Sequence, residues 1–104
     1  MGGRRSRIRL DLNSPAFQEV FFNLEPTELK QVVSSLRRLC SMDWDTLYGH
    51  SGFNWEVVDH IGTPTGAKAC SNCLSRRIRA LAYSDGDLLR FISLHPDHDS
   101  AYGG

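Results

Sequence analysis

The spacing of apolar residues changes from alternating to helical early in the chain. Residues 7–12 read Arg-Ile-Arg-Leu-Asp-Leu, which is the period of a half-buried strand. Ser14-Pro15 follows as a capping residue and a proline that a first helical turn accepts, and helical spacing then predicts a helix over residues 14–23. A second helix is expected to begin at Pro26. Its apolar stripe comprises Leu29, Val32, Val33, Leu36, Leu39 and Cys40.

The second half of the chain is dominated by strand patterns. A short helical turn is expected over residues 42–48, a strand over 53–60, a loop over 62–66, and a strand over 67–74 that could merge with the next. Two apolar runs, 76–83 and 88–94, flank Asp85-Gly86, a strong hairpin signal because both residues tolerate positive φ. The order β-α-α-β-β-β predicts an α+β domain with two N-terminal helices packed on one face of a small, mostly antiparallel sheet.

The hairpin register follows if Asp85 and Gly86 are its two loop residues. Arg79 then lies opposite Ile92 and Ala80 opposite Phe91. The face expected to be buried collects Ile78, Ala80, Ala82, Leu89 and Phe91. The face expected to be open carries Arg77, Arg79, Leu81, Tyr83, Leu88, Arg90, Ile92 and Leu94.

Length and composition suit one small domain. The 104 residues are 40% hydrophobic and 23% charged, so a single domain over residues 1–104 is expected, with residues 1–6 flexible. No apolar run approaches the ~20 residues of a membrane span, which favours a cytoplasmic location. Three cysteines are an odd count, which argues against a disulfide framework.

Charge is neutral in total but unevenly distributed. The chain has 12 basic and 12 acidic residues, yet arginines gather near its start and in the hairpin. Guanidinium groups match the geometry of phosphate oxygens, so arginines on a sheet face indicate phosphate binding. Because a general nucleic-acid binder usually has a basic balance, any nucleic-acid contact is expected to be local or aided by a partner.

The closing segment resembles the RelE/ParE superfamily of bacterial toxins. That superfamily combines a strand, a helical hairpin and further strands that end in an arginine-bearing hairpin and a His/Arg-rich segment closed by tyrosine. The matching positions here are Arg79 and Tyr83, the Asp85-Gly86 turn, the strand over 88–94, and His98-Asp99 through Tyr102. The resemblance covers residues 8–102.

The resemblance implies the toxin of a type II toxin–antitoxin system, most simply a ribosome-dependent, metal-free mRNA endonuclease that inhibits translation. Its partners would be a cognate antitoxin protein and mRNA on the ribosome, with no cofactor, metal or membrane. Its chemistry would use a base for the ribose 2′-hydroxyl, arginines for the phosphate, and an acid for the leaving oxygen. The implied catalytic residues are Arg79, Arg77, His98 and Tyr102. The implied RNA-binding residues are Arg90, Arg76, His95 and Tyr83, with His95 also a candidate acid or base.

Other interpretations of the same residues stay open. A gyrase-poisoning toxin or a non-catalytic interaction module could share this fold. Cys70 and Cys73 with His95 and His98 have the residue types of a zinc site, although the separation exceeds that of a usual zinc finger. The tail could also bind a catalytic metal through His95, Asp97, His98 and Asp99, if a residue such as His60 or Glu56 joined them.

Overall fold

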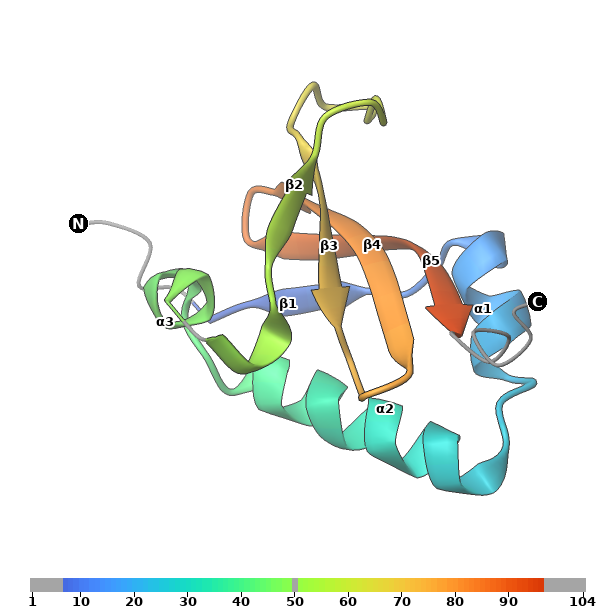
Figure 1. The fold of residues 1–104 in the computed structure, drawn as a ribbon. Helices are drawn as coiled ribbons and strands as arrows, with labels where there is room; N and C mark the ends of the chain where they lie inside the picture. The colour runs from blue at the N-terminus through green and yellow to red at the C-terminus, as the bar shows by residue number, and fades with distance from the viewer. Residues whose placement is uncertain (1–6, 50, 97–104) are drawn as a thin grey trace.

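Helices and strands segregate into two layers, which confirms the predicted α+β class (Figure 1). The structure is a computed structural model and describes residues 7–49 and 51–96. The helices are α1 (Pro15–Phe21), α2 (Pro26–Cys40) and α3 (Trp44–Tyr48), followed by a short 3₁₀ turn at Ser51–Phe53. The strands are β1 (Arg9–Asp11), β2 (Glu56–Val58), β3 (Ala69–Cys73), β4 (Ile78–Asp85) and β5 (Leu88–Pro96).

The strands form one sheet in the order β1-β5-β4-β3-β2. β1 runs parallel to β5, whereas all other neighbours are antiparallel, so the sheet is mostly antiparallel as expected. The first strand of the chain therefore lies against the last one. This placement brings the residues that precede α1 next to the β4–β5 hairpin, with the Arg9 N–H donating to the Asp87 carbonyl at 3.0 Å.

Each helix begins where the sequence offers a suitable first turn. The Ser14 hydroxyl accepts from the Phe17 N–H at the start of α1, and Pro15 and Pro26 occupy first-turn positions that need no N–H partner. Asp43 caps α3 by accepting from the Thr46 N–H at 2.8 Å. The helices are therefore fixed by local chemistry as well as by packing.

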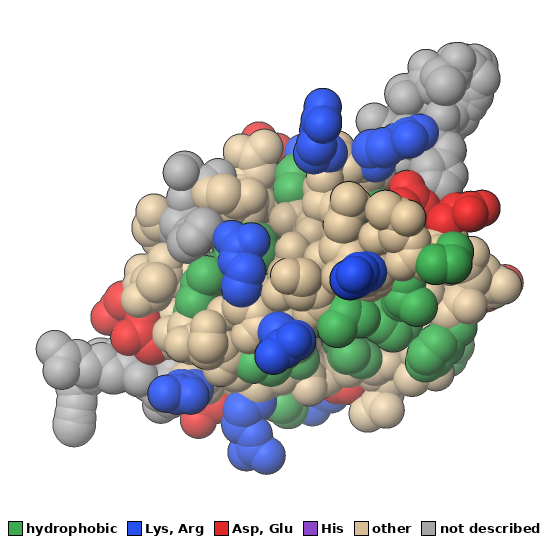
Figure 2. Space-filling view, turned by 90° about the horizontal axis from the view of Figure 1, so that it is seen from below, with side chains coloured by type: hydrophobic (Ala, Val, Ile, Leu, Met, Phe, Trp, Pro, Cys, Tyr) green, Lys and Arg blue, Asp and Glu red, His purple; other side chains and the backbone are tan. Residues whose placement is uncertain are grey.

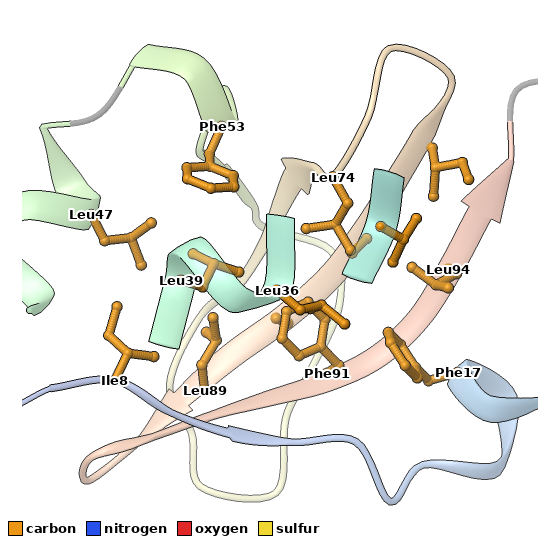
Figure 3. Close-up of a cluster of buried hydrophobic side chains, with 14 of the residues drawn as sticks. Ile8, Phe17, Leu36, Leu39, Leu47, Phe53, Leu74, Leu89, Phe91 and Leu94 are labelled. Atoms are coloured by element: carbon orange, nitrogen blue, oxygen red, sulfur yellow. The ribbon is translucent and has the colours of Figure 1, made fainter. Parts of the chain in front are cut away.

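One core fills the space between the helices and the inner face of the sheet (Figure 3). α1 contributes Phe17, whose ring lies 5.4 Å from that of Phe21 and 5.3 Å from that of Phe91. α2 contributes Val32, Leu36 and Leu39. The five hairpin residues predicted to be buried are all in the core: Ile78, Ala80, Ala82, Leu89 and Phe91.

The hairpin turn lies one residue later than predicted. Asp85 pairs with Leu88, so the two loop residues are Gly86 and Asp87. Gly86 has φ +62°, a left-handed conformation that glycine adopts without steric cost, whereas Asp85 remains in the strand. The Asp-Gly pair marked the hairpin correctly, but the glycine takes the first loop position.

A bulge shifts the register further along the hairpin. Ala82 pairs with Phe91, but its neighbour Leu81 pairs with Ser93, which leaves Ile92 as an extra residue in β5. The later turn and the bulge together place Arg79 opposite His95, so its predicted pairing with Ile92 is wrong.

Two residues assigned to the open face are buried. Leu94 is 2% exposed because the bulge reverses the alternation of β5 and turns it into the core. Tyr83 is 8% exposed on the outer side, where the β2–β3 loop approaches it. The open face is therefore smaller than the alternation predicted.

The other element boundaries differ only in extent. The strands expected over residues 7–12 and 53–60 shorten to three residues each. The segments expected over 67–74 and 76–83 are separate antiparallel strands, because the chain turns tightly between Cys73 and Ile78. None of the helices in residues 7–49 and 51–96 is long and apolar enough to cross a membrane.

Two phenylalanines of the same segment test the core. Phe17→Ala should lower the free energy of unfolding by about 3–5 kcal/mol, because the ring is fully buried and its loss leaves a cavity. Phe22→Ala, where the ring is 71% exposed, should change stability by about 0.5 kcal/mol or less. Urea denaturation of both variants measures the difference, and similar losses would show that α1 does not pack as described.

Candidate functional site

The outer face of the sheet, opposite the helices, brings Arg79 and His95 together. The two residues are directly opposite each other in β4 and β5, and both are exposed. Opposite residues of an antiparallel pair have Cβ atoms about 4.5–5.5 Å apart, so a guanidinium and an imidazole share one patch of surface. Within the described residues, Arg79 takes part in none of the ion pairs.

A serine completes this patch. Ser93 precedes His95 by two residues on the same strand, and its Oγ lies 2.7 Å from the His95 Nε2. A hydrogen bond at this nitrogen restrains the ring and influences which nitrogen carries the proton. Sequence reasoning missed Ser93, although a Ser-x-His spacing in a strand places both side chains on one face. We call Arg79, Ser93 and His95 the outer-face site.

The bulge that creates this site is tied to the start of α1. The Ser14 hydroxyl donates to the Ile92 carbonyl at 2.7 Å, while the same oxygen accepts from the Phe17 N–H. A bulged residue interrupts the ladder and leaves backbone groups to be satisfied otherwise. Ser14 therefore links the helix cap to the point where the register of β5 changes.

Arg90, a predicted RNA-binding residue, is held by two carboxylates. Its Nε donates to the Asp85 carboxylate at 2.7 Å, and its Nη1 donates to the Asp11 carboxylate. The hydrogen bond that Arg90 donates to Asp85 is the main cause that raises the pKa of Arg90, and the charge of Asp11 acts in the same direction. Arg90 thus joins β1, β4 and β5, and it lies opposite Tyr83 of β4.

Arg76 and Arg77 lie in the β3–β4 turn beside α2. Arg76 lines a groove of about 480 Å³ with Lys30, Ser34 and Arg38. Arg77 lines a wider hollow next to it, with Arg76 and residues from the first turns of α2. Figure 2 views the α2 side of the molecule, where lysine and arginine side chains are spread among uncharged ones. These two arginines are thus placed at the helix side of the turn.

Of the remaining predicted site residues, the structure describes Tyr83. Tyr83 is on the outer side of the sheet but largely covered. His98 and Tyr102 fall outside the described residues. Of the four predicted catalytic residues, the structure therefore describes Arg79 and Arg77. His95 lies beside Arg79.

The cysteine half of the candidate zinc site does not converge. Cys70 and Cys73 are three residues apart in one strand, so their side chains point to opposite faces of the sheet. Cys70 is buried, whereas Cys73 lies on the outer side in the row of Arg79. In residues 7–49 and 51–96, no group of three or more His, Cys, Asp or Glu side chains could hold a metal ion.

Comparisons with known proteins found a similar solved structure but no matching family. No protein-family model matches the chain, and no curated protein matches it. A solved structure of a copper-bound mutant toxin from Helicobacter pylori is similar, at 14% identity and a TM-score of 0.49. The similarity covers 88% of this chain and 97% of that toxin. At that level it carries no inference about activity.

The link between Ser14 and the bulge can be tested by removing the hydroxyl. Ser14→Ala should lower the free energy of unfolding by about 1–2 kcal/mol, because the helix loses its cap and the Ile92 carbonyl loses its donor. Chemical denaturation measures the loss, and NMR should show shifted amide signals for Ser93 and His95. Ser34→Ala, an exposed serine of α2, is the matched control and should leave both unchanged.

Thiol labelling tests the placement of the cysteines. Burial is the main cause that raises the pKa of Cys70, opposed by a hydrogen bond with Trp55, so the reactive thiolate is scarce and shielded. In the native protein at pH 8, Cys70 should react with iodoacetamide at least about tenfold more slowly than the exposed Cys40. In urea the two should react alike. Equal native rates, read by mass spectrometry, would contradict the fold of β3.

Proposed function

We propose that this protein is the toxin of a toxin–antitoxin system and that it cleaves RNA at the outer-face site. The observation that carries the proposal is the direct cross-strand pairing of Arg79 with His95 on an exposed sheet face. A planar cation that binds phosphate thus lies beside an imidazole, the side chain that most often serves as a general acid or base. The order of strands and helices supports the same assignment through the resemblance to the RelE/ParE superfamily.

The proposed reaction needs only side chains and the RNA itself. His95, held by Ser93, takes the proton of a ribose 2′-hydroxyl, and that oxygen attacks the adjacent phosphorus. The bond from phosphorus to the 5′-oxygen of the next nucleotide breaks, leaving a 2′,3′-cyclic phosphate. Arg79 stabilises the charge that accumulates on the phosphate oxygens during this step. The leaving 5′-oxygen receives a proton from a second acid.

His98 and Tyr102 retain their proposed roles on the strength of the resemblance alone. His98 is the proposed second imidazole, which supplies the proton to the leaving oxygen, and Tyr102 is proposed to stack on a base. Arg76 and Arg77 are proposed to contact phosphates of the same RNA that lie further from the cut. Arg90 has a weaker case than its neighbours, because Asp11 and Asp85 already engage its guanidinium.

The partners in this proposal are mRNA on the ribosome and a cognate antitoxin, both in the cytoplasm. A chain with no net charge has little general attraction for RNA, so the ribosome would supply the encounter and the outer-face site the chemistry. An antitoxin that covers this exposed face would suppress the activity.

Arg79 is the sharpest test of the proposal. Arg79→Ala should lower cleavage about a hundred- to a thousand-fold, because one preorganised donor to the phosphate is lost. Arg79→Lys should also be poor, since an ammonium cannot reproduce the two-pronged contact. Primer extension on cellular mRNA after induced expression, together with pulse labelling of protein synthesis, measures the effect.

Arg37→Ala is the matched control, because this arginine is exposed on α2 and lies on the helix side of the sheet. It should cleave like the parent protein, and all three variants should unfold at similar denaturant concentrations. Intact mRNA and normal growth with the parent protein would refute the toxin proposal. A loss of DNA supercoiling with translation at first unaffected would favour a gyrase poison instead. Full cleavage by both Arg79 variants would move the site away from this face.

A further inference from the structure

A second hollow lies on the same side of the sheet as the outer-face site, nearer the hairpin turn. It has a volume of about 390 Å³, which is within the usual range for small-molecule sites. One wall is the β2–β3 loop, which contributes Ile61, Gly62 and Pro64. The opposite wall comes from β1, β4 and β5, including Tyr83 and Ile92. We call it the loop pocket.

The lining of the loop pocket combines apolar side chains with polar ones, among them Asn13 and Ser14. Ile61, Pro64 and Ile92 supply apolar surface, whereas Asp11 and Arg90 supply an acceptor and a donor. The ion pairs of Arg90 with Asp11 and Asp85 use two of the five N–H groups of a guanidinium, which leaves donors for a ligand. Apolar faces combined with a polar edge are the surface properties of a nucleobase.

The loop that forms the outer wall is held by its own hydrogen bonds. The Gly66 N–H donates to the Thr63 carbonyl at 3.1 Å, and the Ala67 N–H donates to the Thr65 hydroxyl at 3.3 Å. An ion pair of 3.1 Å between Lys68 and Asp59 joins the two ends of the loop. A wall ordered before binding loses less conformational entropy when a ligand enters.

The loop pocket is close enough to the outer-face site to hold a neighbouring part of the same substrate. Ile92 lines the pocket, and His95 follows it by three residues in β5. At about 3.3 Å per residue, the two lie roughly 10 Å apart along the strand. A nucleotide adjacent to a scissile phosphate at Arg79 is therefore within reach of the pocket.

We infer that the loop pocket binds one unstacked base of single-stranded RNA and thereby sets a base preference beside the cut. That the base belongs to an RNA strand rests on the proposed RNA cleavage. That the pocket accepts a nucleobase rests on its lining alone. Asp11 accepts from the base edge and Arg90 donates to it, and because the order of donors and acceptors along that edge differs from base to base, this pair of groups discriminates among the bases. The apolar side chains of the loop cover the base faces.

The direct test is titration of the isotope-labelled protein with adenosine, guanosine, cytidine and uridine, followed by NMR. At least one nucleoside should shift the signals of Tyr83 and Ile92 in a saturable way, and ribose should not. Ile61→Ser should weaken that binding about tenfold or more, because part of the apolar wall is lost. Val57→Ser is the matched control, since Val57 is 54% exposed on β2 and does not line the pocket.

Titration with a short single-stranded RNA shows whether the ligand of the loop pocket is RNA or a free nucleoside. The RNA should bind more tightly than the nucleoside and shift His95 as well as Ile92. Equal affinities for RNA and nucleoside would overturn the assignment to RNA. No shift with any nucleoside would overturn the pocket inference even if the protein cleaves mRNA. Nucleoside binding without cleavage would sustain the pocket and refute the proposed activity.

Discussion

The structure depends on one extra residue in β5. A strand alternates its side chains between two faces, and the bulge at Ile92 resets that alternation halfway along the longest hairpin. Phe91 before the bulge and Leu94 after it both reach the core, which an unbroken alternation would forbid. His95 is consequently turned outward, opposite Arg79. Without the bulge, the imidazole would face the core and a leucine would occupy the outer-face site.

The arginines of this chain divide by what surrounds them. Arg90 lies where three strands meet and is held by carboxylates from two of them, so it serves the arrangement of the sheet. Arg79 lies near the start of β4, at the end of the hairpin away from its turn, and it forms no ion pair within the described residues. An arginine bound by two acids would have to exchange strong contacts for a phosphate, whereas Arg79 has none of these to give up. Both arginines lie on the outer side of the same hairpin, so only their partners distinguish them.

The sequence predicted the elements better than their registration. Periodicity identified α1, α2 and the core residues of the hairpin other than Leu94, because these depend on which residues are apolar. The bulge was missed, although alternation continued from Phe91 would place Ser93 on the core face and Leu94 outside, which is a departure from the pattern of a regular strand. The pairing of Arg79 with His95 follows from the later turn and the bulge together and was therefore missed. The partners of Arg90 were also hidden, because Asp11 is distant in sequence and reaches it only through the parallel pairing of β1.

The two outer strands of the sheet, β1 and β2, have only three residues each. The short length of these edge strands affects association between copies of the chain. With a formal net charge of zero and an isoelectric point near 6.9, copies of the chain do not repel one another at neutral pH. A long, flat border would then invite strand-to-strand association between copies. Borders of three residues that carry Arg9, Asp11 and Glu56 offer too short a template for such association, which limits this route to aggregation in a protein without net charge.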